Sequence, residues 1–341
     1  MNNLTQDRLL RLAEQTFRNN FKPGVSFERA IFFSWGCVIG DCAFCYMSKQ
    51  PEGKELRETR RSQESILAEF ILAKAVGWDI GFFTGGMGIL QPSELEFLLK
   101  SATEIIGEKL WLSVGPVSKP LLKRYLPYIK GVVGSTETIN PELHQKVCPS
   151  KPLEPYELMF KTAKELNLKT AMTFIVGMGE AREDLKLLIS FIQKYDIDKI
   201  HVYGLIPQQG TIFEKAEIPA KEEQAWWIAQ LRVAFPRLDI QCGVWEDRVE
   251  RVSLLLKAGA NSISKFRATK LFGTTVAAEV ERQAALAGRT FTGSLTILPK
   301  ANWDETVSVL SLDDKMKLRV RSKLEVYLRQ IKKNIGNRVR A

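Results

Sequence analysis

Short β-rich runs alternate with longer amphipathic segments along most of the chain, and this alternation constrains the fold more than any other feature. Eight runs predict strands, at residues 30–35, 79–85, 110–115, 131–136, 169–177, 199–205, 238–243 and 261–264. Apolar residues at helical spacing predict helices between them, among others at 62–76, 92–106, 155–166, 182–195 and 222–235. Strict alternation favours an α/β fold in which a parallel sheet closes as a (β/α)8 TIM-like barrel. An open doubly wound sheet is the alternative.

The chain is long enough for one large core, because it has 341 residues and a hydrophobic content of 45%. No internal repeat or Gly/Ser linker divides the sequence. We expect an N-terminal helical segment at 1–29, the barrel at 30–290 and a C-terminal extension with a basic helix at 291–341. The sequence has neither a charged-then-apolar leader nor an apolar run long enough to cross a bilayer. This predicts a cytoplasmic protein with no membrane partner.

The positive charge of the chain is concentrated at its C-terminal end. Residues 315–341 hold ten Lys or Arg and one Glu, so they carry +9 of the formal net charge of +10. Apolar residues in this segment predict a helix with one buried stripe and a basic outer face; they are Met316, Leu318, Val320, Leu324, Tyr327, Leu328 and Ile331. The basic face is either a solvated surface or a docking surface for an acidic partner.

Three of the five cysteines lie within "FSWGCVIGDCAFCYMS", directly after the first predicted strand. Chemistry in such barrels collects at the carboxyl ends of the strands. Five cysteines in this chain are too few for a secreted disulfide framework, so their grouping indicates metal or redox chemistry. Three thiolates suit a [4Fe–4S] cluster with one iron left open. One alternative is that these are small buried thiols. The other is a zinc site whose fourth ligand comes from elsewhere in the chain, since neither of the two histidines is nearby in the sequence.

The spacing Cys37-x4-Cys42-x2-Cys45, with Phe44 and Tyr46 beside the last cysteine, resembles the radical S-adenosylmethionine (radical SAM) superfamily. The usual spacing there is three residues and then two. The resemblance implies a [4Fe–4S] cluster that binds S-adenosylmethionine, with Phe44 and Tyr46 next to the cofactors. It also implies a low-potential electron donor of the ferredoxin or flavodoxin type, which drives cleavage to methionine and a 5′-deoxyadenosyl radical. That radical would abstract hydrogen from a substrate C–H bond.

A glycine pair follows the second predicted strand. The stretch around Gly85, Gly86 and Met87 resembles the superfamily's GGE-like segment, which binds the methionine end of S-adenosylmethionine, with Met87 in place of the acidic residue. Paired glycines would permit close backbone approach to this ligand. The alternative is an ordinary turn.

Two later segments carry further parts of the resemblance. The run "STETINPELHQKVCPSK" is similar to one in the HydE-type hydrogenase maturase, which implies that Glu137 contacts S-adenosylmethionine with help from a basic neighbour. The alternative for Glu137 is an acid at the start of a helix. The run "FIVGMGEAREDL" resembles the G-x-I-x-G-x-x-E-like segment of the superfamily and implies an adenine contact near Val176 and Gly177. We expect Glu180 to cap the helix that follows.

The run "LLLKAGANSISKF" at 254–266 is similar to the AGANSI run of biotin synthase. The resemblance therefore belongs to the branch of biotin synthase, HydE and pyrrolysine synthase, whose members have complete barrels. Biotin synthesis itself is not expected. Ala171 stands where biotin synthase has a cysteine of its auxiliary cluster, and Val244 stands where it has an arginine.

The remaining candidate residues lie at late positions in the predicted barrel. Cys148 and Cys242 are candidate ligands of an auxiliary iron–sulfur cluster or a sulfur donor, or else unpaired buried thiols. His201, Tyr203 and Gln208 are candidates for lining the substrate end of the barrel. His201 could equally be a core imidazole.

Within this branch, the chain has most affinity with archaeal-type, two-protein lipoyl synthases. That affinity implies sulfur insertion into an octanoyl chain on an acidic lipoyl carrier protein, together with a second radical SAM protein. A second enzyme hypothesis is cofactor maturation of the HmdB or HydE type. A hypothesis of another class is a non-catalytic iron–sulfur scaffold that binds nucleic acid through its basic tail.

Overall fold

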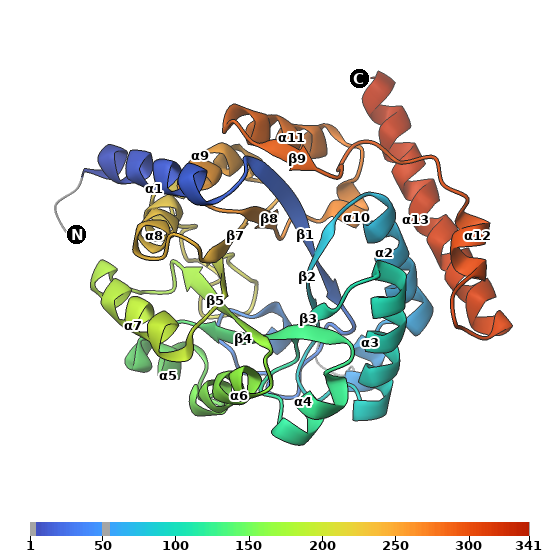
Figure 1. Cartoon of the computed structure of the whole chain (residues 1–341), viewed down its shortest axis with the longest axis horizontal. Coiled ribbons are helices and arrows are strands. Elements are labelled where there is room, and N and C mark those ends of the chain that lie inside the picture. Colours follow the sequence, from blue (N-terminus) through green and yellow to red (C-terminus); the bar gives the residue numbers. More distant parts are fainter. Residues whose placement is uncertain (1–4, 50–54, 341) are drawn as a thin grey trace.

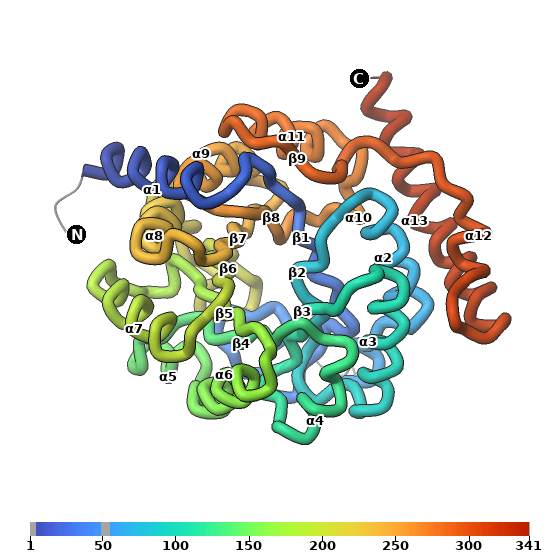
Figure 2. The backbone as a smooth tube through the Cα atoms, viewed as in Figure 1, coloured from blue at the N-terminus to red at the C-terminus, as the bar shows by residue number. Residues whose placement is uncertain are grey.

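The computed structural model describes residues 5–49 and 55–340, and its centre is a closed parallel barrel (Figure 1, Figure 2). The strands are β1 Gly24–Phe32, β2 Asp79–Thr84, β3 Leu110–Ser113, β4 Ile129–Glu137, β5 Lys169–Val176, β6 Lys199–Gly204, β7 Asp239–Gly243 and β8 Ser262–Ser264. They pair in sequence order from β2 to β8, and β1 pairs with both β8 and β2, which closes the ring. The predicted barrel is therefore confirmed, and the open doubly wound sheet is wrong.

Helices cover the outside of the barrel. They are α2 Gln63–Ala75, α3 Pro92–Ile106, α4 Lys119–Tyr125, α5 Pro141–Val147, α6 Glu154–Glu165, α7 Leu185–Tyr195, α8 Lys221–Ala234, α9 Val252–Lys257, α10 Ala268–Leu271 and α11 Thr275–Leu286. Buried apolar side chains between this helical layer and the strands form the main hydrophobic core. Burying each large apolar side chain there contributes roughly 1.5–3 kcal/mol.

The first strand begins earlier than the sequence predicts. We expected it at 30–35, but β1 spans Gly24–Phe32, so residues 24–29 belong to the barrel and not to the N-terminal helical segment. The reason is that Glu28 faces the barrel interior, where it pairs with the buried ammonium of Lys199. A charged residue in a strand hides the apolar alternation that marks a half-buried strand.

The two ends of the chain pack against opposite sides of the barrel (Figure 1). Helix α1, Gln6–Asn20, lies against α8 and buries Phe17 beneath the guanidinium groups of Arg232 and Arg289. At the other end, β9, Thr290–Thr292, pairs with the start of β1. The C-terminal extension therefore begins inside the sheet, and continues through α12, Trp303–Ser308, to α13, Asp314–Arg340.

Helix α13 lies along α2 and has the predicted basic outer face. Its buried stripe consists of Val320, Leu324, Leu328 and Ile331. Leu318 was expected in this stripe, but it is 73% exposed because it lies off the face that the spacing of three and four residues defines. The basic face is partly neutralised, since Arg319 pairs with Glu64 of α2. Of the helices in 5–49 and 55–340, none is long and apolar enough to cross a membrane.

Candidate active site

The three clustered cysteines lie in the segment that joins β1 to α2, at the carboxyl end of the barrel. Neighbouring loops hold this segment in place. The amide of Val38 donates to the carbonyl of Met87 at 3.1 Å, in the loop after β2. The amide of Ala43 donates to the carbonyl of Val147 at 2.8 Å, at the end of α5. We call residues 33–48 the cysteine loop.

The cysteine loop packs directly against the glycine pair that follows β2. A Cβ atom on Gly86 would come within 1.6 Å of the Gly36 carbonyl oxygen and 2.6 Å of the Cys37 Cα, and a Cβ on Gly85 would enter the ring of Phe33 at 2.2 Å. The amide of Gly86 donates to the Ser34 hydroxyl at 2.9 Å. The glycines therefore allow the cysteine loop to pack closely on them, and their predicted contact with S-adenosylmethionine stays a prediction. Met87, the third residue of this motif, accepts a hydrogen bond on its sulfur from the Tyr156 hydroxyl at 3.6 Å.

All five cysteines are free thiols, and Cys42 lies next to Cys148. The pKa of the Cys42 thiol is raised, first by its hydrogen bond with Cys148 and then by burial, while Lys151 opposes both. Burial also raises the pKa of Cys45. In the part of the chain that the structure describes, no three His, Cys, Asp or Glu side chains are gathered as for a metal ion. The chemistry of three free thiols on one loop nevertheless fits an iron–sulfur cluster.

An ion pair lies next to these thiols. Glu137, the last residue of β4, accepts a hydrogen bond from Thr173 at 3.0 Å and lies 3.3 Å from the ammonium of Lys151. Lys151 also lies 5.8 Å from the ring centroid of Phe44 and interacts electrostatically with Cys42. Burial alone would lower the pKa of Lys151, but the Glu137 carboxylate raises it well above its ordinary value. Lys151 is thus the basic neighbour that the sequence predicts for Glu137.

The helix after Glu137 has a different cap, so the alternative of a helix-start acid is wrong. Helix α5 begins at Pro141, and its N-cap Asn140 accepts the amide of Leu143 at 3.2 Å. The two aromatic residues of the cysteine loop differ in environment. Phe44 is half-buried beside Lys151, whereas Tyr46 is 54% exposed.

The last two residues of β5 point to opposite sides of the barrel wall, because side chains alternate along a strand. The Val176 side chain lies in the main hydrophobic core outside the barrel, whereas Ile175 lies in the cluster with Cys42, Cys148 and Tyr203. The adenine contact expected near Val176 and Gly177 stays a prediction. Ile175 is the residue that sequence reasoning missed, and the same alternation could have indicated it.

Glu180 does not cap the helix that follows it. Its carboxylate turns back and accepts the amides of Gly177, Met178 and Gly179 at 2.6, 2.9 and 3.2 Å. Gly177 has a φ of 100°, which a glycine adopts readily. Asp184 accepts the amide of Ala181 at 3.1 Å across the 3-10 turn Arg182–Asp184 that precedes α7.

A buried charged network fills the amino end of the barrel. The carboxylate of Glu28 contacts the Lys199 ammonium at 2.5 Å, the Ser262 hydroxyl at 2.6 Å and the side-chain amide of Gln241. Burial would raise the pKa of Glu28, but Lys199 lowers it below its ordinary value. Sequence reasoning missed these residues. No predicted strand contained Glu28, so nothing in the sequence indicated that it lies opposite Lys199.

His201 and Tyr203 face the barrel interior above this network. Gln241 donates its amide to Glu28, so its oxygen is an acceptor for His201 Nδ1 at 2.7 Å and for the Tyr203 hydroxyl at 3.1 Å. Nδ1 therefore carries the imidazole proton, and the buried Nε2 is an acceptor with no partner among the described residues. Burial lowers the pKa of His201 to about 3, so the ring is neutral. Gln208 is half-buried in the loop after β6, and its carbonyl accepts the amide of Thr211 at 3.1 Å.

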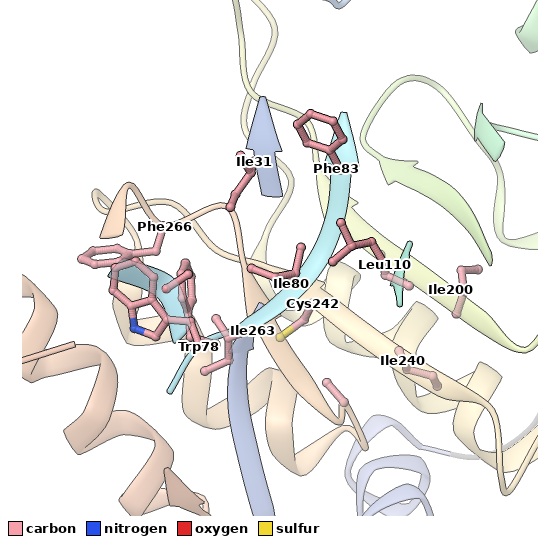
Figure 3. Packing of buried hydrophobic residues seen from close by; sticks show 14 of the residues in the cluster. Ile31, Trp78, Ile80, Phe83, Leu110, Ile200, Ile240, Cys242, Ile263 and Phe266 are labelled. Carbon is pink, nitrogen blue, oxygen red and sulfur yellow. The ribbon is translucent and has the colours of Figure 1, made fainter. Parts of the chain in front are cut away.

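Cys242 lies away from the barrel interior, contrary to our expectation. Figure 3 shows its sulfur packed with Ile80 and Ile263 in the main hydrophobic core. The neighbouring Gln241 points inward, so strand alternation turns Cys242 outward. Its thiol donates to the Ser262 carbonyl at 3.4 Å, and burial raises its pKa to about 12. Cys148 and Cys242 are therefore on different sides of the barrel wall.

A parallel barrel with three free thiols on the loop after its first strand suits the class of barrel enzymes that carry an iron–sulfur centre. A family model described as the Radical SAM superfamily matches residues 31–192. The chain belongs to this superfamily and is a radical SAM enzyme. Membership implies a [4Fe–4S] cluster and S-adenosylmethionine.

Similar proteins agree with the branch that the sequence indicates. An uncharacterized protein of Methanocaldococcus jannaschii is 36% identical over 85% of this chain and 82% of its own length. A biotin synthase of Shewanella halifaxensis is 25% identical over 80% of this chain and 79% of its own. The crystal structure of methylornithine synthase (PylB) has a TM-score of 0.68, with 22% identity, and covers 76% of this chain and 78% of that one.

Proposed function

We propose that Cys37, Cys42 and Cys45 hold the [4Fe–4S] cluster and that the enzyme abstracts hydrogen from a small polar substrate, in a reaction of the cofactor-maturation type. The observation that carries this proposal is the contact of the cysteine loop with the Glu137–Lys151 pair at the carboxyl edge of the barrel. When bound and reduced by a ferredoxin- or flavodoxin-type donor, the cluster supplies the electron that cleaves S-adenosylmethionine to methionine and a 5′-deoxyadenosyl radical.

The residues of the chain bind and orient S-adenosylmethionine. Glu137 binds the ammonium of its methionine end, and Lys151 binds the carboxylate. The two groups lie 3.3 Å apart, so a zwitterion can exchange its own charges for the existing ion pair. Phe44 and Ile175, which pack in one cluster with Cys42 and Cys45, provide apolar contacts for S-adenosylmethionine, and the backbone near Gly177 contacts its adenine. Gly85 and Gly86 act indirectly, by allowing the cysteine loop to pack on them.

The barrel interior keeps water and other hydrogen donors away from the radical. A small cluster of Phe82, Trp111, Val133 and Ala171 forms an apolar patch inside the barrel. Phe82 meets the ring of His201 edge to face, with the centroids 5.2 Å apart. Apolar walls with few acceptors and a neutral imidazole favour transfer from one positioned C–H bond.

The arrangement of thiols supports maturation chemistry more than sulfur insertion. Of the two cysteines outside the cluster motif, Cys148 contacts Cys42 and Cys242 is packed in the outer core. Neither has further thiols around it that could hold a second cluster, since the chain has five cysteines in all. Sulfur would therefore have to come from outside this chain.

Sulfur insertion into an octanoyl chain on a lipoyl carrier protein is the second candidate. The observation that favours it is the basic outer face of α13, which suits an acidic carrier. Similarity to a biotin synthase also supports sulfur chemistry. In this second candidate reaction, a second radical SAM protein supplies the sulfur. A reducing cytoplasm would keep the five free thiols of this chain reduced.

Anaerobic reconstitution tests the proposal. We expect roughly four irons and four sulfides per chain, and release of 5′-deoxyadenosine from S-adenosylmethionine and dithionite. Cys42→Ala should lose both iron and product, whereas Cys242→Ala, the matched removal of a thiol from the outer core, should retain both. Equal iron content in the two variants would contradict the assignment of the ligands.

A second experiment separates the two candidates. An octanoylated carrier peptide is incubated with enzyme, S-adenosylmethionine and reductant, with and without a candidate second radical SAM protein, and its mass is followed. Roughly eight irons per chain, or a sulfur-containing peptide product, would replace maturation by sulfur insertion. An unchanged peptide together with one cluster per chain supports maturation chemistry.

A further inference from the structure

Two residues with long charged side chains, at the carboxyl ends of barrel strands, have an unusual backbone conformation. Four residues other than glycine have positive φ in 5–49 and 55–340, and Asn167 and Asp196 among them are small polar residues that follow helices. The other two are Glu137, the last residue of β4, with a φ of 62°, and Lys265, directly after β8, with a φ of 69°. This conformation costs about 1–2 kcal/mol for such residues. It persists where surrounding structure maintains it, often at functional sites.

Lys265 lies in a position that three adjacent strands build. Its ammonium is 4.2 Å from the ring centroid of Tyr203 on β6. Between them, at the end of β7, is Gly243, where a Cβ atom would come within 2.4 Å of the Tyr203 ring and 3.0 Å of the Lys265 Cγ. The glycine therefore leaves the space in which the lysine lies across the ring.

The ammonium of Lys265 lacks a carboxylate partner. Across the described chain, Glu137 pairs with Lys151, and no acidic group lies within ion-pair distance of Lys265. Burial lowers its pKa although Glu137 and Cys45 act in the opposite direction. Of the cysteines, Cys45 is the one whose charge acts on Lys265. A partly buried cation without a counterion is stabilised when an anion binds beside it.

A second unsatisfied polar group lies deeper on the same strand as Tyr203. His201 is 0% exposed, and its Nε2 has no hydrogen-bond partner in the described residues. Because Nδ1 carries the proton toward Gln241, Nε2 can only accept. A hydroxyl or amino group of a ligand would satisfy it.

We infer that Lys265 binds the carboxylate of the substrate and that a hydroxyl or amino group of the same molecule donates to His201 Nε2. The inference deepens the proposed function, on which it rests, by naming the substrate class: a small carboxylate with a second polar group. An octanoyl amide has neither feature. Glu137 and Lys151 remain for S-adenosylmethionine, so the two carboxylates have separate cations.

The test uses small probes of defined chemistry, measured by calorimetry on the reconstituted enzyme with saturating S-adenosylmethionine. The probes are hydroxy acids of increasing length, from glycolate to 5-hydroxypentanoate, and their neutral amides. We expect at least one hydroxy acid to bind wild type about tenfold more tightly than its amide. Lys265→Met, which keeps the packing on Tyr203, should remove this preference. Lys257→Met, an exposed lysine of α9, should leave it unchanged.

Further measurements address the alternatives. Binding of S-adenosylmethionine should change less than about threefold in Lys265→Met; a large loss with the hydroxy-acid preference intact would assign Lys265 to S-adenosylmethionine and overturn the inference. No preference for any hydroxy acid over its amide in wild type would also overturn it. His201→Phe should equalise the binding of a hydroxy acid and its deoxy analogue. Release of 5′-deoxyadenosine by wild type, measured separately, reports on the proposed function and not on Lys265.

Discussion

Replacing Gly86 by alanine adds a single methyl group, which should displace the cysteine loop. The new Cβ would lie 1.6 Å from the Gly36 carbonyl oxygen and 2.6 Å from the Cys37 Cα. Ordinary contact needs about 3.5 Å, so the loop must retreat by about 2 Å. That movement breaks the bond from Val38 to Met87, at 3.1 Å, and the bond from Gly86 to Ser34, at 2.9 Å.

The expected loss in free energy of unfolding is about 3–5 kcal/mol, from about 1 kcal/mol for each hydrogen bond and 1–3 kcal/mol for overpacking. Urea unfolding measures it, and iron content after reconstitution should fall in parallel. Gly336→Ala is the matched control, because its Cβ meets nothing within 4 Å in helix α13. That variant should gain about 0.5–1 kcal/mol. Wild-type iron content and stability in Gly86→Ala would refute the reasoning.

Three further predictions concern buried groups. Unfolded His201 binds a proton below about pH 6.5, whereas the folded residue does so only near pH 3. Stability should therefore fall on acidification by on the order of 1.4 kcal/mol per pH unit between roughly pH 5 and 4, and His201→Asn should lose this part of the slope in urea titrations. Ile175→Ala should weaken S-adenosylmethionine binding about tenfold in calorimetry, whereas Val176→Ala should lower only stability. Glu69→Gln removes the buried carboxylate charge that pairs with Arg29 and Arg61, each at 2.6 Å. This variant should lose about 3–5 kcal/mol of unfolding free energy in urea.

Hydrophobic patterns are sufficient to predict most of the barrel. Strands β2 to β8 lie within two residues of their predicted ends, because their outward faces pack on the helical layer. The hydrophobic pattern does not predict the start of strand β1. Its outward Arg29 pairs with Glu69 of α2 and its inward Glu28 pairs with Lys199, so both faces carry buried charge. A single sequence does not indicate which distant residue neutralises such a charge.

Site residues that belong to one short motif could be predicted from the sequence. Contacts between residues of separate helices, strands and loops could not. Spacing identifies Cys37, Cys42 and Cys45, but the contact of Cys42 with Cys148 depends on how α5 ends. Alternation along β7 decides which residues face inward, and our expectation that Cys242 could face the cavity ignored it. Lys265 lies in the run that resembles AGANSI, but the resemblance gave it no role. Its significance comes from its backbone conformation and from the space beside Gly243.

The hydrogen bond between Ala43 and Val147 bears on the order of events during synthesis. The thiol-bearing segment emerges early from the ribosome, yet one of its anchors is made much later. Long-range contacts of this kind form slowly. Iron delivery to a nascent chain would therefore meet thiols without their final geometry until translation has passed Val147, which makes loading a late step of biogenesis.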